Sequence, residues 1–444
     1  MQLAEAKAVD SKEFEQCGPF MHQLMAQLFP ICRSISGDGV RETLRILQGL
    51  IPLTQFEVPS GAKVFDWTVP KEWNIRDAFV LDPKGRKIID FKKSNLHVLG
   101  YATPADQLVT LSELQEHLHS LEDQPDAIPW VTSVYEERWG FCLTHNERTK
   151  LEEGTYRVFI DSELKNGSLT YGELIIPGAS SKEIFISTYI CHPSMANNEL
   201  SGPVVATTLA KWIASEPRRF TYRIIFIPET IGSIIYLSRN MESMKKNIVA
   251  GFNLTCVGDE RAYSYLPSRK GSTLADKVAL NVLRSKHPDF KQYSFLDRGS
   301  DERQYCSPGV DLPVVSLMRT KYREFPEYHT SLDNLEFVTP AGLQGSFALH
   351  KDCIELLERN RVYKTRCLGE PQLGIRGLYP TIATKESHRQ VIDMLNFIAY
   401  ADGTNDLIDI SNIIQVPVRS LYPLIDKLIA ADLLLECDTN ERAQ

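Results

Sequence analysis

The sequence has 444 residues, 43% of them hydrophobic and 24% charged, which suits a soluble globular protein of two or three domains with a large core. A formal charge of −8 and an isoelectric point near 5.8 provide no general attraction to nucleic acid or to an anionic membrane, so neither is expected as a partner. The nine cysteines form no Cys-x-x-Cys pair, the first residues lack the pattern of a secretory signal, and no stretch approaches the roughly 18 apolar residues of a membrane helix. We therefore expect reduced thiols and a cytoplasmic protein.

The character of the chain changes near residue 56. Residues 13–55 contain two segments whose apolar residues recur at helical spacing, on either side of a Ser-Gly-Asp-Gly turn. Residues 56–150 instead alternate apolar and polar side chains, are rich in aromatic and β-branched residues, and include a Pro-Lys-Gly turn typical of a hairpin. This second segment is predicted to be a small β-rich insert.

Apolar strands alternate with helical segments between residues 151 and 367. Continuous apolar strands in such an alternation indicate an α/β fold, with a mixed or parallel sheet covered by helices on both faces. We assign residues 13–55 and 151–367 together to one main domain that is interrupted by the insert. No internal repeat or low-complexity segment is visible.

The last segment, residues 368–444, predicts a winged helix: two helical patterns, a third that starts at a proline, and a short β wing. From Gly369 onward it carries six Lys and Arg against eleven Asp and Glu. Because phosphate contacts supply most nonspecific affinity for DNA, an acidic module is repelled by DNA. We expect this winged helix to bind protein.

Polar side chains that suit metal binding or acid–base catalysis follow four strands of the main domain. In open α/β sheets, ligands collect beyond the carboxyl ends of the strands. The candidates are His192, Asn197, Asn198 and Glu199 after the first strand, Glu229 after the second, Thr255, Asp259 and Glu260 after the third, and Arg319, Lys321, Arg323, Glu327, His329 and Asp333 after the fourth. Imidazole with carboxylate is the ligand set of a hydrolytic zinc.

Each of these residues also has a purely structural explanation. A single histidine at a strand end, such as His192, is more often hydrogen-bonded than metal-bound, and residues 197–201 suit a helix cap. The alternative for Glu229 is a solvated acid at a strand end, and Cys191 and Cys256 are better explained as small core residues. The joint occurrence of these elements in one chain order favours a functional site.

That order resembles the zinc-dependent aminopeptidases and glutamate carboxypeptidases, which have a phosphorylase/hydrolase-like α/β fold. The motifs are strand-His…Ala-Asn-x-x-x-Ser-Gly, strand-Pro-Glu-x-x-Gly-Ser, and Ser-Asp-Glu…strand…Tyr-His-Thr-Ser-x-Asp. More closely, the chain resembles bacterial aminopeptidase-like proteins of unknown function that combine this fold with a β insert and a C-terminal winged helix. The resemblance covers nearly the whole chain, and residues 299–334 are its most specific stretch.

The resemblance implies two zinc ions that share a bridging aspartate, each with its own histidine, and a glutamate as general base. His192 and His329 match the two histidines and Glu229 matches the base. Three ligand carboxylates, however, fall on Asn198, Thr230 and Thr255. Because neutral side chains cannot offset the repulsion between two divalent cations, we expect one zinc ion and not two.

We predict that His192, His329 and one carboxylate hold this zinc ion, with Glu199 as the first choice for the carboxylate. Asp259 is the reserve, and Asn198 and Asp259 are further candidates for a ligand or a neighbour of the ligands. The alternative is a two-metal site in which Glu199 acts as the bridge and Asp259 or Glu260 replaces the third-strand ligand.

The predicted reaction is hydrolysis of an amide or peptide bond. Glu229 would take the proton of a zinc-activated water and return it to the leaving amine. Four basic residues are candidates for binding a substrate carboxylate, with ion pairing to nearby acids as the equally weighted alternative: Arg303, Arg319, Lys321 and Arg323.

The expected substrate is a small peptide or amide, and a homo-oligomer is also considered. The insert is interpreted as a lid or dimer contact, or as a structural insertion without a ligand. Two rival functions stay open: a catalytically inactive peptidase-like binding protein, and a winged-helix regulator.

Overall fold

The computed structural model describes residues 14–379 and 385–437, which divide into two compact units. The first unit comprises the described residues up to Asp276 together with Asp289–Lys351, and the second comprises Lys277–Pro288 and the described residues from Asp352 onward. Within the described residues, no helix is long and apolar enough to cross a membrane.

An eight-stranded sheet forms the centre of the first unit, in the order β1-β10-β12-β11-β13-β16-β14-β15. Its middle strands, β12, β11, β13 and β16, are parallel, and β10 and β14 run antiparallel to them. The bounds are β1 Thr54–Pro59, β10 Ser168–Ile176, β11 Ser180–Tyr189, β12 Phe220–Ile227, β13 Ile248–Leu254, β14 Ser264–Leu266, β15 Lys291–Gln292 and β16 Val314–Met318. This mixed sheet confirms the predicted α/β class.

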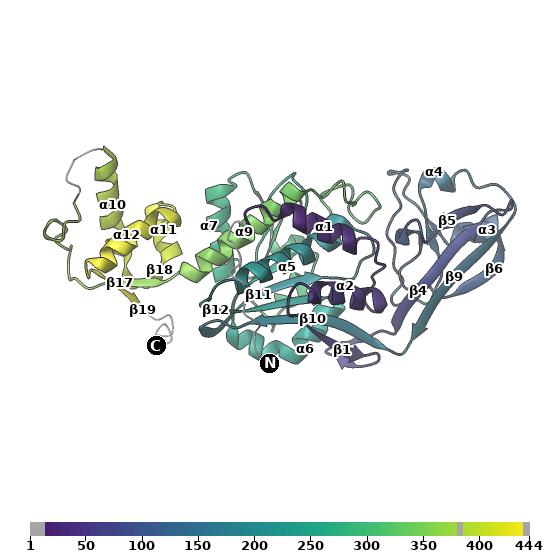
Figure 1. Cartoon of the computed structure of the whole chain (residues 1–444), viewed down its shortest axis with the longest axis horizontal. Helices are drawn as coiled ribbons and strands as arrows, with labels where there is room; N and C mark the ends of the chain where they lie inside the picture. Colours follow the sequence, from purple (N-terminus) through teal and green to yellow (C-terminus); the bar gives the residue numbers. More distant parts are fainter. Residues whose placement is uncertain (1–13, 380–384, 438–444) are drawn as a thin grey trace. The chain divides into compact units, whose positions relative to one another are not determined.

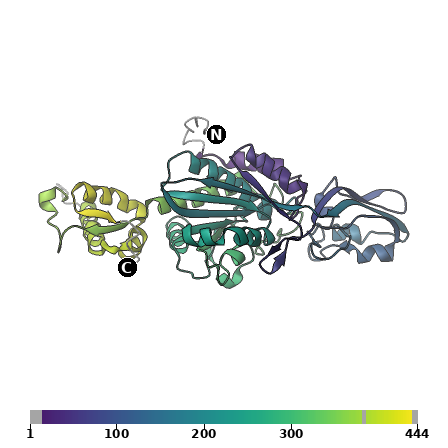
Figure 2. The same ribbon diagram turned by 90° about the horizontal axis from the view of Figure 1, so that it is seen from below.

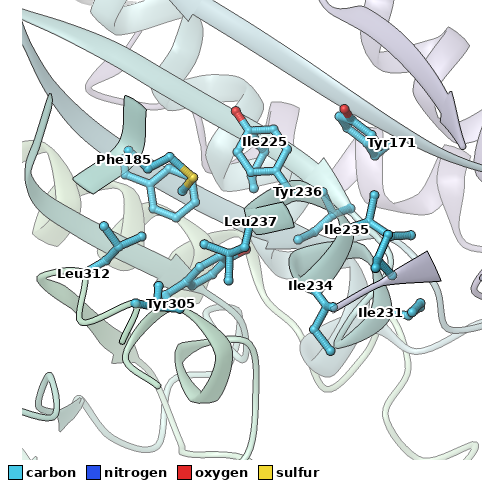
Figure 3. Packing of buried hydrophobic residues seen from close by; sticks show 14 of the residues in the cluster. Tyr171, Phe185, Ile225, Ile231, Ile234, Ile235, Tyr236, Leu237, Tyr305 and Leu312 are labelled. Atoms are coloured by element: carbon cyan, nitrogen blue, oxygen red, sulfur yellow. The ribbon is translucent and has the colours of Figure 1, made fainter. Parts of the chain in front are cut away.

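Helices lie on both faces of this sheet (Figures 1 and 2). Successive side chains of a strand point to opposite faces, so Phe185 and Ile225 join one apolar cluster with α6 residues such as Ile235 (Figure 3), and Ile184 and Ile186 are buried on the other face. The helices of this unit are α1 Gly18–Leu28, α2 Asp38–Gln48, α5 Ser201–Ala214, α6 Ile231–Asn247 and α8 Glu302–Tyr305. Two further helices include residues of both units, α7 Leu274–Lys286 and α9 Pro340–Arg359.

The β-rich segment contains a four-stranded antiparallel sheet in the order β5-β4-β9-β6, with its own apolar cluster. The Pro-Lys-Gly turn joins β4 to β5, and Gly85 there has a φ of 76°, which a residue with a Cβ rarely adopts. The bounds are β4 Glu72–Leu81, β5 Lys87–Asp90, β6 Ala105–Thr110 and β9 Thr155–Lys165, with the short elements β2 Lys63–Val64, β3 Trp67–Thr68, α3 Leu111–Glu116, β7 Leu118–His119, β8 Phe141–Cys142 and α4 His145–Arg148. The boundaries predicted at residues 56 and 150 stay a prediction.

The second unit contains the predicted winged helix. Three helices accompany a three-stranded sheet in the order β18-β17-β19. The bounds are β17 Val362–Thr365, α10 Lys385–Tyr400, β18 Asp402–Asp406, α11 Leu407–Ile414, α12 Val418–Ala430 and β19 Leu434–Cys437. Pro417 precedes α12 directly, where its missing N–H costs no hydrogen bond.

Candidate active site

The polar strand ends that the sequence singles out meet at one edge of the eight-stranded sheet. His192 follows β11, Glu229 follows β12, and Thr255 follows β13. Since β11 lies between β12 and β13 and all three are parallel, their carboxyl ends are neighbours. The chain leaves β11 for β12 on one side and later returns to β13 on the other, which is a topological switch point, where α/β sheets bind ligands.

A π-helical turn, Ala196–Leu200, follows His192 and leads into α5. The Asp333 carboxylate holds this turn in place by accepting the backbone N–H groups of Asn197 at 2.6 Å and of Asn198 at 2.9 Å. Burial raises the pKa of Asp333 to about 7, although these backbone hydrogen bonds oppose the shift. Single π-helical turns often occur at functional sites because they reorient side chains.

On its Nδ1 side, His192 contacts groups that already have protein partners. Glu199 Oε2 lies 3.0 Å from His192 Nδ1, and Arg33 Nε donates to Glu199 Oε1 at 3.3 Å. Both side chains of this Arg33–Glu199 ion pair are fully buried. Arg33 also donates to the carbonyl oxygens of His192 at 3.1 Å and Leu28 at 2.7 Å. We call this the inner side of His192.

The Nε2 atom of His192 faces the other way, toward Glu229, and His329 is a second neighbour of the His192 ring. Glu229 Oε2 lies 3.9 Å from His192 Nε2, and the imidazole centres of His192 and His329 are 5.5 Å apart. The Trp130 ring lies against both, with centre-to-centre distances of 4.4 Å to His192 and 4.7 Å to His329. The Glu229 side chain keeps 23% of its exposure. We call this the outer side of His192.

The two histidines have opposite pKa shifts. Burial lowers the pKa of His192, but the hydrogen bond to Glu199 and the charges of Glu199 and Glu229 outweigh it, so the net shift is upward. Burial, with the charges of His192 and Arg323, lowers the pKa of His329 to about 2. His329 is therefore neutral at physiological pH, which is the form that binds metal ions.

Beside Glu229, Thr230 has an unusual backbone conformation, with φ 63° and ψ −77°. Its N–H donates to Asp301 Oδ1 at 2.7 Å, and its hydroxyl accepts a hydrogen bond from Arg303 Nη2 at 2.8 Å. Burial raises the pKa of Glu229, and burial together with the Glu229 charge raises the pKa of Asp301 to about 8. These groups hold Glu229 at the start of α6 in an environment that favours proton uptake.

Neutral hydrogen bonds and a guanidinium group surround the three positions that replace ligand carboxylates. Asn198 Nδ2 donates to the Tyr189 hydroxyl at 2.8 Å, and that hydroxyl lies 2.6 Å from Thr255 Oγ1. The third position, Thr230, hydrogen-bonds to Arg303. Asn198 Oδ1 is buried without a hydrogen-bond partner. The three side chains themselves thus offer one oxygen without a partner, that of Asn198, and the carboxylate beside them is Asp301, which accepts the Thr230 N–H.

Residues 22–360 match the family described as a domain of unknown function, DUF4910, and residues 361–436 match the description winged helix-turn-helix. The chain belongs to the DUF4910 family. It is 44% identical over 423 residues to a protein of Clostridium acetobutylicum that has the provisional name polysaccharide biosynthesis protein with aminopeptidase-like domain, and the match covers 94% of this chain and 96% of that protein.

Solved structures show the same architecture. A protein of Clostridium acetobutylicum provisionally described as a peptidase has a TM-score of 0.90 at 43% identity, covering 96% of this chain and 98% of its own. The zinc aminopeptidase BSAP of Bacillus subtilis has a TM-score of 0.57 at 12% identity, and an M28 peptidase precursor of Shewanella amazonensis has 0.54 at 12%, each covering 78% of this chain and 95% of its own. The expected resemblance to aminopeptidase-like proteins, with a zinc-aminopeptidase fold and a winged helix, is confirmed.

The four basic residues predicted to bind substrate lie in different surroundings. Arg303 contacts Thr230 and is an electrostatic neighbour of Glu229, and Arg323 is an electrostatic neighbour of His329. Arg319 instead stacks over Tyr263 at 3.9 Å. Lys321 lies over the Tyr293 and Tyr322 rings and 3.9 Å from Glu324. The first two thus have neighbours at the site, whereas these side-chain partners of Arg319 and Lys321 lie in the surrounding loops.

Asp259, the reserve ligand, makes hydrogen bonds with both of its carboxylate oxygens. It accepts from Asn197 Nδ2 at 3.0 Å, from Thr320 N at 3.0 Å and from Thr320 Oγ1 at 2.7 Å. Among the described residues, Cys191, His192 and Glu199 form the one group of three His, Cys, Asp or Glu side chains whose ligand atoms lie within 4.8 Å of one another. Two further residues contact His192, namely Arg33 and Trp130. No local sequence pattern indicates either of them.

Proposed function

We propose that this protein is a zinc-dependent amide or peptide hydrolase of aminopeptidase type, with Glu229 as the general base. The observation that carries the proposal is the outer side of His192, where Nε2 and the Glu229 carboxylate lie 3.9 Å apart beside a second, neutral imidazole, His329. Two imidazoles and a carboxylate at the carboxyl edge of a parallel sheet are the groups that a hydrolytic zinc site needs.

His192 and His329 fit one shared zinc ion. Two imidazoles that bind the same zinc through bonds of about 2.0–2.1 Å, at a tetrahedral angle, have ring centres roughly 5 Å apart. The observed 5.5 Å is close to this value. The unused Oδ1 belongs to Asn198, which donates to the hydroxyl of Tyr189, a residue whose ring centre lies 5.3 Å from that of His192. A zinc ion held there would supply an activated water and would polarise the carbonyl of the substrate.

One ion fits better than two. A second divalent cation needs anionic ligands to offset the repulsion between the metals. Asn198 and Thr255 instead belong to a neutral hydrogen-bonded cluster with Tyr189, and Thr230 is bonded to the positively charged Arg303. These contacts support the single-metal form of the proposal.

We call the arrangement with zinc on the outer side of His192 the outer form of the site. In this form Glu199 is not the zinc ligand that the sequence predicts. A histidine that binds a metal through one nitrogen usually donates its other N–H to a carboxylate, which fixes the tautomer and the ring orientation. Glu199 lies at Nδ1 in this way, and Arg33 holds its other oxygen. We therefore propose Glu199 as the group that orients His192.

The alternative form, with Glu199 as a direct ligand, places the ion on the inner side with Cys191 and His192 Nδ1. Burial raises the pKa of the Cys191 thiol well above its ordinary value, which disfavours the thiolate that a metal requires. The buried guanidinium of Arg33 occupies the same region and repels a divalent cation. We favour the outer form for these two reasons.

In the proposed reaction Glu229 takes a proton from the attacking water and then delivers it to the leaving nitrogen. Its raised pKa, caused first by burial, suits a group that must both accept and release a proton near neutral pH. Arg303 is an electrostatic neighbour of Glu229 and Arg323 of His329, which supports a role for both in binding an anionic group of the substrate. The name of the relative from Clostridium acetobutylicum suggests that this substrate belongs to polysaccharide biosynthesis.

Elemental analysis of the purified protein tests the metal, and a screen of aminoacyl and acyl-amide substrates tests the reaction. We expect one zinc per chain and amide hydrolysis that a chelator abolishes and zinc restores. Two zinc ions per chain would restore the bridged two-metal mechanism. Absence of bound zinc would favour the catalytically inactive binding protein.

The winged helix stays a predicted protein-binding module, and DNA binding that weakens with salt would contradict this.

A further inference from the structure

A segment of the β-rich insert is hydrogen-bonded to the loop that carries His329. Trp130 N donates to the His329 carbonyl at 2.9 Å, and Ser331 N donates to the Ile128 carbonyl at 2.9 Å. Ser331 Oγ accepts from Ile128 N at 2.9 Å. Pro129 and Thr330 form an isolated antiparallel bridge between the two segments. Residues 128–130 and 329–331 are therefore paired like two short strands, although about 200 residues separate them in the chain.

This pairing involves a strained residue. His329 has a φ of 58°, a left-handed conformation that a residue with a Cβ rarely adopts because it is strained. The carbonyl of His329 is the acceptor for Trp130, and its ring stacks on Tyr328 with centres 3.8 Å apart. Such a conformation persists only where its surroundings enforce it. The contact with the insert is one of these enforcing interactions.

The Trp130 side chain completes the contact. It is half-buried, and its ring lies against His192 at 50° and against His329 at 77°. His192 is only 2% exposed. One side chain of the insert thus covers both imidazoles on the outer side of the site.

We propose that Trp130 is a positioning residue: the insert supplies it as a wall that orients His192 and His329, keeps water from them, and presents an apolar surface to the substrate. This inference rests on the proposed function for its chemistry, and on the contacts of Trp130 for its structure. A substrate group that lies over the histidines then contacts an indole face, so we expect an apolar or ring-shaped group there.

The insert contains a matched control. Trp139 also stacks on a histidine, His117, with ring centres 3.6 Å apart. Trp139 packs against the apolar cluster of the insert, and its ring contacts are with His117 and Phe141 and not with His192 or His329. Trp139→Ala therefore removes the same side chain from the same segment of the chain without opening the proposed wall.

The first measurement needs no metal. Metal-free wild type, Trp130→Ala, Trp130→Phe and Trp139→Ala are treated with diethyl pyrocarbonate, and the modification of each histidine is followed by peptide mass spectrometry with exposed His388 as the internal reference. In Trp130→Ala we expect the rates at His192 and His329 to rise toward that of His388. Trp130→Phe should stay close to wild type, and Trp139→Ala should raise only the rate at His117. Unchanged rates at both site histidines in Trp130→Ala would overturn the proposal.

The second measurement is zinc affinity by competition with a chelator. We expect Trp130→Ala to bind zinc about 10–100-fold more weakly, as when other groups that orient a metal ligand are removed, with partial recovery in Trp130→Phe. If wild type binds no zinc but the histidines of Trp130→Ala become reactive, the result supports shielding by Trp130 and contradicts the proposed zinc hydrolase. If wild type binds zinc and the variant binds it equally well, the result is consistent with the hydrolase and contradicts the positioning role of Trp130.

Discussion

The carboxylates on the two sides of His192 differ in how many of their oxygens already have hydrogen-bond partners in the protein. On the inner side, Glu199 uses one oxygen for His192 Nδ1 and the other for Arg33, and both partners are fully buried. On the outer side, Glu229 lies 3.9 Å from Nε2, beyond hydrogen-bond distance, and keeps part of its exposure. A carboxylate whose oxygens already have hydrogen-bond partners in the protein stabilises the fold. A carboxylate without such partners can instead interact with water or substrate.

Glu72 extends this comparison to a third carboxylate. Both of its oxygens accept hydrogen bonds from Arg41, at 2.8 Å and 2.6 Å, and one also accepts the backbone N–H of Ser168 at 2.9 Å. Hydrogen bonds to Arg41 lower the pKa of Glu72 to about 2, although burial opposes this shift. Burial raises the pKa of Glu229. The two shifts are opposite because bonding to Arg41 outweighs burial at Glu72, whereas burial dominates at Glu229.

The largest expected effect is on the outer side. Glu229→Gln removes the proton acceptor and should lower turnover by about 10²- to 10⁴-fold, because this is the usual contribution of a general base. Bound zinc should remain, measured by elemental analysis of the same sample. Glu152→Gln, the same change at a surface ion pair with Lys84, is the control and should leave turnover unchanged. Full activity of Glu229→Gln would remove Glu229 from the mechanism.

On the inner side, Arg33→Met should reduce stability. It leaves the fully buried Glu199 carboxylate without its cationic partner, and such losses cost about 3–5 kcal/mol in the free energy of unfolding. Urea denaturation measures this change. The double variant Arg33→Met/Glu199→Leu should recover most of it, because no buried charge remains. Arg76→Met, which breaks the exposed pair with Asp161, should leave the denaturation midpoint unchanged. A stable Arg33→Met would show that the ion pair does not hold the inner side together.

Glu199→Gln, with a smaller expected effect, distinguishes between Glu199 as the group that orients His192 and Glu199 as a direct zinc ligand. In Glu199→Gln the side-chain carbonyl can still accept the N–H of His192, but the charge that strengthens this bond is gone. We expect zinc affinity to fall about 10–100-fold with the fold retained, as for other groups that orient a metal-bound histidine. Chelator competition and circular dichroism measure the two quantities. Complete loss of zinc from a folded variant would instead make Glu199 a direct ligand.

The sequence was sufficient to predict that three polar strand ends lie at one edge of the sheet. His192, Glu229 and Thr255 each follow an apolar strand directly, and the chain order of strands and helices determines that parallel strands end together. The winged helix was predictable for a similar reason, because its helices have clear apolar periodicity and a proline at the start of the third.

Arg33 and Trp130 were not predictable because their partners are distant in the chain. Arg33 lies 166 positions before Glu199, in a loop between two helices, and no local pattern indicates a buried ion pair. Trp130 follows a proline in the insert and reaches the site through pairing of its backbone with the His329 loop. Which nitrogen of His192 faces Glu199 and which faces Glu229 also depends on tertiary contacts, because the sequence does not determine the orientation of the imidazole ring.

The smallest expected effect is a pH dependence at Glu72. The folded pKa of Glu72 is about 2 and its ordinary value is 4.5, so its ion pair with Arg41 contributes stability above about pH 4.5 that is lost as the pH falls toward about 2. Allowing for the partial exposure of Arg41, we expect Glu72→Gln to cost about 1–2 kcal/mol at pH 7. Urea denaturation at pH 7 and near pH 3.5 should show a smaller difference between wild type and variant at the lower pH, because the wild type has by then lost part of this contribution. The same difference at both pH values would mean that Glu72 acts through packing and not through its charge, and the contrast with Glu229 would then no longer rest on ionisation.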